Sequence, residues 1–190
     1  MGALSLAIVT LGTGSFGSAA HAAAQSIASF ATGFAHPLGG VDHILAMVTV
    51  GVRGVLAGGR ALWVWPAVFV ATMLTGFAAA TLGLQLPWVP TAVSSSIIVL
   101  GLMVALAVKA PVWLGAALVG LFAFFHGHAH GTEAGAASLV IYGAGFALAT
   151  AGLHAAGIGL ALAAAGSMGK RAVQAMGALT VLGGLALIGA

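Results

Sequence analysis

The residues that could do chemistry in this chain gather in two short windows, each with histidines around one acidic residue. The first window is residues 36–43 (HPLGGVDH), and the second is residues 126–133 (HGHAHGTE). Asp42 and Glu133 are the only two acidic residues of the 190, and each lies in otherwise apolar sequence. Because an ionisable side chain in such a stretch is costly to bury, each window is a functional-site hypothesis.

Metal binding is the chemistry that these residue types indicate. Imidazole nitrogen with carboxylate oxygen suits borderline divalent metals such as nickel, cobalt, zinc, copper or iron. One divalent cation and two carboxylates also sum to zero charge, which is the least costly ionic arrangement in a low dielectric. The candidate ligands are His36, Asp42, His43, His126, His128, His130 and Glu133, together with His21 nearer the N-terminus.

The spacing within each window predicts which side chains share a helix face. His126, His130 and Glu133 are four and three residues apart, so a continuous helix would place all three on one face. His128 would point elsewhere, unless the glycines on either side of it unwind the segment. His36 and His43 are seven residues apart, which is two helical turns and therefore one face of an unbroken helix.

Two other residues have a structural explanation. A buried histidine outside a cluster is usually satisfied by a neighbouring carbonyl or hydroxyl group, and we expect that role for His154. Met47 lies four residues after His43 and could add a soft ligand, but packing in the core is the better expectation for a single methionine. Five histidines and both acids in two windows of eight residues are too dense for the same explanation.

The elements that position the windows are predicted to be membrane helices. The chain is 62% hydrophobic and 4% charged, with a mean hydropathy of +1.20, far from the composition of soluble domains. Since backbone groups in lipid must be satisfied internally, we expect an all-α integral membrane protein, a bundle of about six transmembrane helices with short loops. The predicted spans are residues 38–57, 62–82, 91–108, 112–127, 136–160 and 172–189.

The N-terminal region leaves two interpretations open. Residues 1–20 have a short apolar stretch followed by small residues, and Ser18-Ala19-Ala20 resembles a signal-peptidase site. Cleavage there would make His21 the first residue of the mature protein, whereas a retained segment would form a seventh helix. Residues 22–35 are predicted to form a short apolar helix leading into Pro37, and residues 21–190 to form a single transmembrane domain.

The five basic residues predict the orientation in the membrane. They are Arg53, Arg60, Lys109, Lys170 and Arg171, and each falls at the same side of the predicted bundle. The positive-inside rule makes that side cytoplasmic in a cell inner (plasma) membrane, with the mature termini and both histidine windows toward the outside. Bases scattered singly over loops do not indicate nucleic-acid binding.

Other common chemistries lack their motifs in this sequence. The chain has no cysteine, so it offers neither a disulfide framework nor a thiolate ligand or nucleophile. No P-loop is present, so no ATPase is expected within this chain. No resident cofactor is expected either, and the sequence does not indicate an oligomeric state.

The windows resemble a known family. HPLGGVDHILAMVTVG at residues 36–51, together with FHGHAHGTE at residues 125–133, resembles the two signature segments of the HupE/UreJ family of nickel and cobalt permeases. The resemblance implies secondary uptake of Ni²⁺ or Co²⁺ into the cytoplasm, with Zn²⁺ as a further candidate ion. It also implies that the seven residues of the two windows coordinate or translocate the metal. The loop at residues 84–90 has no acid, so no ligand is expected there.

Two other functions stay open at this point. A proton or small-solute channel could use the same side chains as a relay, and it would conduct without metal. An intramembrane metalloenzyme is suggested by His126 and His130, which have the His-x3-His spacing of a zinc-protease helix. However, Gly127 occupies the position of the glutamate base, so we do not expect an enzyme.

Overall fold

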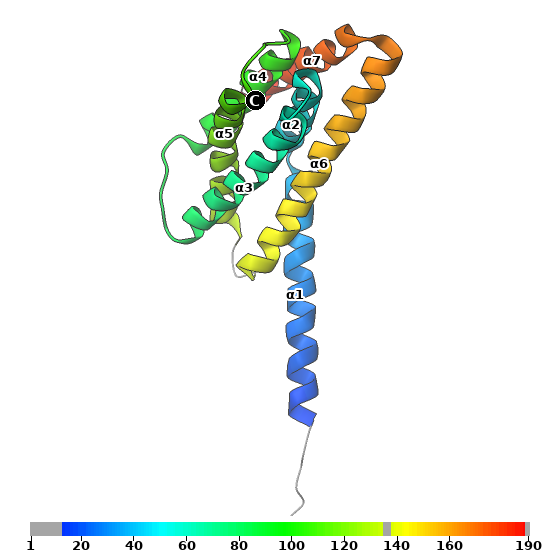
Figure 1. The fold of residues 1–190 in the computed structure, drawn as a ribbon. Helices are drawn as coiled ribbons and strands as arrows, with labels where there is room; N and C mark the ends of the chain where they lie inside the picture. The colour runs from blue at the N-terminus through cyan, green and yellow to red at the C-terminus, as the bar shows by residue number, and fades with distance from the viewer. Residues whose placement is uncertain (1–12, 135–137, 189–190) are drawn as a thin grey trace, which may run out of the picture.

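The computed structural model describes residues 13–134 and 138–188, and these residues form seven α-helices and no strand (Figure 1). The helices are α1 (Thr13–Gly39), α2 (Val41–Ala57), α3 (Ala61–Thr81), α4 (Val89–Ala105), α5 (Val112–Glu133), α6 (Leu139–Met168) and α7 (Lys170–Ile188). The predicted all-α membrane class is confirmed. Helices α2 to α7 correspond to the six predicted spans, but α5 continues to Glu133 and therefore contains the whole second window.

The lengths of the helices refine the predicted number of spans. Within the described residues, α3, α5, α6 and α7 are long and apolar enough to cross a membrane, and α1 with α2 could form a fifth, bent span. Helix α4 is apolar and has 17 residues, which is at the lower limit of length for a transmembrane helix. The described residues therefore form a multi-pass membrane bundle in which four or five spans have full length.

Helix α1 is longer than predicted and is only partly packed. Its N-terminal half extends away from the other helices (Figure 1), and almost every residue from 19 to 28 is exposed. Its C-terminal half packs on α6, where Gly33 meets the backbone of Tyr142 and the Ser138 amide donates to Ser29 Oγ at 3.1 Å. The helix is continuous through Ala20 and His21, and removal of residues 1–20 stays a prediction.

A sharp bend separates α1 from α2, which corrects the expectation that His36 and His43 share one face of a continuous helix. The two helices meet at 83°, and Gly40 between them is extended, with φ −104° and ψ 119°. A Cβ on Gly40 would lie 2.6 Å from Asp42 Oδ1 and 2.9 Å from His43 Nδ1. Glycine therefore leaves room for these two side chains at the start of α2.

Glycines let α3 and α5 approach each other closely, as small residues do in membrane bundles. A Cβ on Gly127 would overlap the carbonyl oxygen of Met73, and one on Gly76 would overlap that of Phe124. Gly127 therefore allows close packing and does not unwind α5, which stays helical to Glu133. This contact sets the register that aims the second window at α1 and α2.

The basic residues gather at the end of the bundle opposite the histidine windows. Arg53, Lys109 and Lys170 line one cavity of about 260 Å³. The Arg53 guanidinium lies 4.8 Å above the Trp65 ring and donates to the carbonyl of Val108. Arg53 is ten residues after His43 on α2, which is about 15 Å along a helix axis. The two ends of the bundle thus differ in charge.

Candidate metal centre

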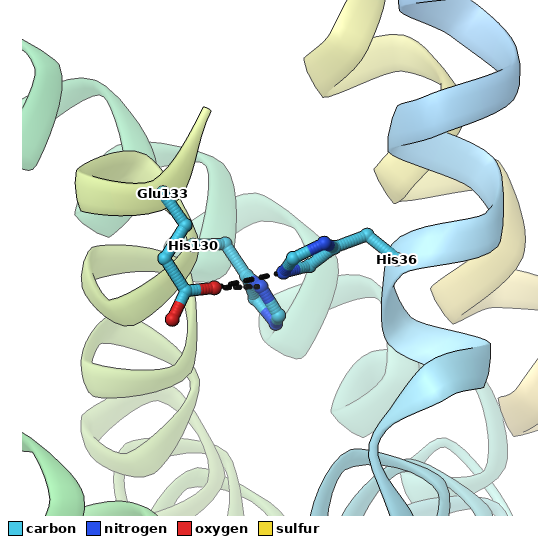
Figure 2. A group of neighbouring side chains, drawn as sticks. All are labelled: His36, His130 and Glu133. Atoms are coloured by element: carbon cyan, nitrogen blue, oxygen red, sulfur yellow. Dashed lines mark hydrogen bonds and ion pairs between the residues drawn. The ribbon is translucent and has the colours of Figure 1, made fainter. Parts of the chain in front are cut away.

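His36, His130 and Glu133 come together where the end of α1 faces the end of α5 (Figure 2). Nε2 of His36 lies 2.9 Å from Oε2 of Glu133, and Nδ1 of His130 lies 3.8 Å from the same oxygen. One ligand atom from each of the three residues lies within 4.8 Å of the other two. We call these three residues the outer site.

The outer site lies at the edge of an open cavity of about 680 Å³, to which Asp42 and His43 also contribute. The side chain of Glu133 is 58% exposed and that of His36 is 31% exposed, whereas that of His130 is 3% exposed. A cation that arrives through the cavity therefore meets Glu133 first and His130 last.

His130 connects the outer site to two deeper histidines. Its ring centroid lies 4.5 Å from that of His36 and 4.2 Å from that of His43, and Phe146 packs against it at 4.3 Å. Neither ring nitrogen of His130 has a hydrogen-bond partner among the described residues. Depending on the tautomer, either Nδ1 or Nε2 of His130 can therefore offer its lone pair to a ligand.

Asp42 fixes the protonation of the His43 ring. Nδ1 of His43 lies 2.9 Å from Oδ1 of Asp42, and an ionised carboxylate can only accept. Nδ1 therefore carries the proton, and the lone pair of His43 is on Nε2, which is buried and has no partner in the part of the chain that the structure describes. A carboxylate that orients a histidine in this way is a common companion of metal-bound imidazole.

Ser96 of α4 fixes the protonation of the His126 ring, as Asp42 does for His43. The Ser96 hydroxyl donates to the carbonyl of Val93 at 2.6 Å, so it accepts from Nε2 of His126 at 2.9 Å. The lone pair of His126 is then on Nδ1, which is buried and has no hydrogen-bond partner among the residues described. The ring centroids of His43 and His126 are 4.9 Å apart, and we call these two residues the inner pair.

The geometry of the outer site fits a transition-metal ion. Metal–nitrogen and metal–oxygen bonds of about 2.1 Å place neighbouring ligand atoms of one ion about 3 Å apart. His36 Nε2 and Glu133 Oε2, which form a hydrogen bond, are already 2.9 Å apart, whereas Nδ1 of His130 at 3.8 Å from the same oxygen would have to move closer. The residues can thus hold a divalent cation between α1 and α5.

The structure places two predicted ligands away from these sites. His128 points to the other side of α5, as expected from its spacing, and its Nε2 donates to the carbonyl of Leu84 at 2.7 Å. His21 is exposed on α1, with its Nε2 3.0 Å from Nε2 of Gln25. His21 is fifteen residues before His36, about 22 Å along the helix axis. His128 instead ties down the loop between α3 and α4, and His21 has no neighbour from either window.

Sequence reasoning missed Ser96 and misjudged His154. Three successive serines, residues 94–96, interrupt the apolar sequence of α4, and this run is the signal that could have indicated a buried polar contact. His154 is 2% exposed, yet within residues 13–134 and 138–188 neither of its ring nitrogens has the carbonyl or hydroxyl partner that we expected. Met47 is fully buried in the apolar core, so its packing role is confirmed.

Comparison with known proteins gives one consistent result. The family model described as HupE / UreJ protein matches residues 9–187. The chain is 41% identical over 157 residues to Protein HupE from Rhizobium leguminosarum bv. viciae, and the match covers 82% of each chain. No solved structure gives a significant match.

Proposed function

The chain belongs to the HupE/UreJ family, and we propose that it is a secondary transporter that takes up Ni²⁺ or Co²⁺ into the cytoplasm. The observation that carries this proposal is the continuous set of imidazoles from the outer site through His130 to the inner pair. Each neighbouring pair of rings in this set is 4.2 to 4.9 Å apart.

In the proposed mechanism the ion loses its water stepwise. The hydrated cation reaches exposed Glu133, exchanges water for His36 and His130, and then moves to the inner pair as His130 changes partners. Passage requires several sites that each release the ion, in contrast to the closed four-ligand shell of a structural zinc site. The shared position of His130 allows one ligand to be exchanged at a time.

The ligand set supports selection of borderline metals. Mg²⁺ and Ca²⁺ prefer shells made of oxygen, whereas the path here consists mainly of imidazole nitrogen. Asp42 and Glu133 would neutralise the charge of one divalent ion as it leaves water. The same ligands also suit Zn²⁺, so the choice among these metals depends on geometry.

The direction of transport is part of the proposal. Because the basic residues are at the end of the bundle opposite the outer site, the positive-inside rule places the outer site outside the cell. The chain has no P-loop, so the ion gradient or trapping of the metal inside supplies the driving force.

Proteoliposomes test this function against a proton or small-solute channel, the alternative to which unpartnered imidazoles also point. Purified protein is reconstituted with a trapped nickel indicator, and parallel vesicles carry a trapped pH indicator. We expect Ni²⁺ or Co²⁺ influx at least about tenfold above protein-free vesicles, with no comparable Mg²⁺ influx. Proton conduction in metal-free buffer without any metal influx would contradict the proposal and support the channel.

A zinc-protease function finds no support. The position that would require the glutamate base is Gly127, and a side chain there would overlap the backbone of α3 at Met73. The contact between α3 and α5 thus excludes the base from its place in that motif.

A further inference from the structure

His154 lies in the middle of α6, outside the path from the outer site to the inner pair. The residue is 2% exposed, and neither Nδ1 nor Nε2 has a hydrogen-bond partner among the described residues. Buried polar groups are almost always paired, because an unpaired one loses its hydration without replacement. An imidazole with two unpaired nitrogens in an apolar core therefore requires an explanation.

One aromatic ring contacts both His154 and a member of the inner pair. The Phe69 ring centroid lies 5.8 Å from that of His126 and 5.0 Å from that of His154, edge to face with the latter. The two imidazoles thus contact the same phenyl ring. Phe69 is therefore the contact that links His154 to the inner pair.

His154 is also deeper in the bundle than the inner pair. Gly51 packs directly on the His154 backbone, since a Cβ at this glycine would overlap the His154 carbonyl oxygen. Gly51 is eight residues after His43 on α2, which is about 12 Å along the helix axis. His154 therefore lies between the inner pair and the end of the bundle that contains Arg53.

The surroundings of His154 offer further donor atoms. Thr150 is one helical turn before His154 on the same face of α6, and its hydroxyl lies 3.5 Å from Sδ of Met73. Met73 belongs to the same buried cluster as Phe69. Hydroxyl and thioether groups can assist a metal ion that an imidazole holds, so this part of the core is not purely hydrocarbon.

We propose that His154 is a third station for the transported metal, a ligand that receives a divalent transition-metal ion from His126 after the Phe69 ring has moved aside. This inference rests on the proposed transport function and extends the path beyond the two windows. A ligand at this depth would shorten the apolar distance that the ion must cross before it reaches the opposite end of the bundle.

Two substitutions separate ligation from packing. His154→Leu keeps a buried side chain but removes the ligand atoms. His154→Cys replaces imidazole by a thiolate that can also bind the metal, and it introduces a single thiol because the chain has no cysteine. Ala161→Cys is the matched control, since Ala161 is also fully buried on α6 but belongs to a separate apolar cluster.

The first readout is transport by the purified full-length protein in liposomes. We expect His154→Leu to lose at least about tenfold in Ni²⁺ influx, while Ni²⁺ affinity at the outer site, measured in detergent by equilibrium binding, stays within twofold of wild type. His154→Cys should recover a substantial part of the influx. Influx by His154→Leu at the wild-type rate would overturn the third station but leave the proposed transport function intact.

The second readout is the near-ultraviolet absorption of Co²⁺ bound to thiolate, which does not depend on transport. We expect this charge-transfer band in His154→Cys loaded with Co²⁺, and its absence in wild type and in Ala161→Cys. Its absence in folded His154→Cys would overturn the proposal, even where His154→Leu is inactive, because a packing role would then suffice. Failure of wild-type protein to move any metal would instead contradict the transport function.

Discussion

Nδ1 of His43 is 2.9 Å from Oδ1 of Asp42, the residue that precedes it in the chain, and Nε2 of the same ring is buried without a partner. The carboxylate thus leaves the lone pair of His43 on the buried Nε2 and supplies negative charge beside the ring. Because Gly40 gives the two side chains their room, the bend between α1 and α2 contributes directly to the metal path.

Asp42→Asn should reduce metal affinity and uptake by about 10- to 100-fold, the usual effect of removing a carboxylate that supports a metal-bound histidine. An amide can donate to Nδ1 of His43, which would move the proton to Nε2 and block the lone pair. Asp42→Glu keeps the charge and should retain more uptake than Asp42→Asn. Equal uptake by Asp42→Asn and wild type, at equal membrane abundance, would show that the tautomer of His43 is unimportant.

Gly40→Ala should lower uptake by about tenfold, because the added methyl group collides with both Asp42 and His43. Gly39→Ala is the matched control, since a Cβ there meets no atom within 4 Å. The two variants differ by one position and carry the same added group. Similar uptake rates for both would contradict the proposed role of the bend.

His36→Ala and Glu133→Gln should each reduce uptake strongly. The double variant should take up metal as fast as the more impaired of the two single variants. The two side chains are 2.9 Å apart and serve one outer site, so removing either one disables it. Non-additive effects are expected for residues in direct contact. Losses that multiply in the double variant would indicate two independent sites, and a cycle of initial rates measures this directly.

His130→Gln should nearly abolish uptake, whereas His128→Gln should leave the rate per folded molecule within about twofold of wild type. The two residues are on the same helix, but only His130 contacts both His36 and His43. The Gln amide can still donate to the Leu84 carbonyl in place of Nε2, so His128→Gln should change stability by less than about 1 kcal/mol. Uptake rates normalised to abundance, together with thermal unfolding, separate the two effects.

The sequence was sufficient to predict the fold class and the register of the second window. Composition required membrane helices, and the four- and three-residue spacing of His126, His130 and Glu133 correctly placed them on one face of α5. The prediction that His36 and His43 share one helix face was wrong, because the chain bends by 83° at a single extended residue, Gly40. Local spacing cannot show such a break, since the helix pattern continues on both sides of it.

The contacts between distant segments could not be predicted. Ser96 and His126 are 30 residues apart, and His128 and Leu84 are 44 apart, so each pairing depends on how α4 and the loop before it pack on α5. Whether the ring nitrogens of His154 find hydrogen-bond partners likewise depends on how α2 and α3 pack around α6. A sequence shows that a residue can bind a ligand, but not which neighbours leave it free to do so.

Metal uptake through the outer site and the inner pair can be tested in metal-starved cells. The cells express wild type, His36→Ala or Asp42→Asn at equal membrane abundance, and uptake of radiolabelled nickel and cobalt is measured. Wild type should take up metal and both variants should lose this uptake. His36→Ala removes a ligand of the outer site, and Asp42→Asn moves the proton of His43 onto Nε2 and so blocks its lone pair. Well-inserted wild-type protein that takes up neither metal would contradict the transport function itself.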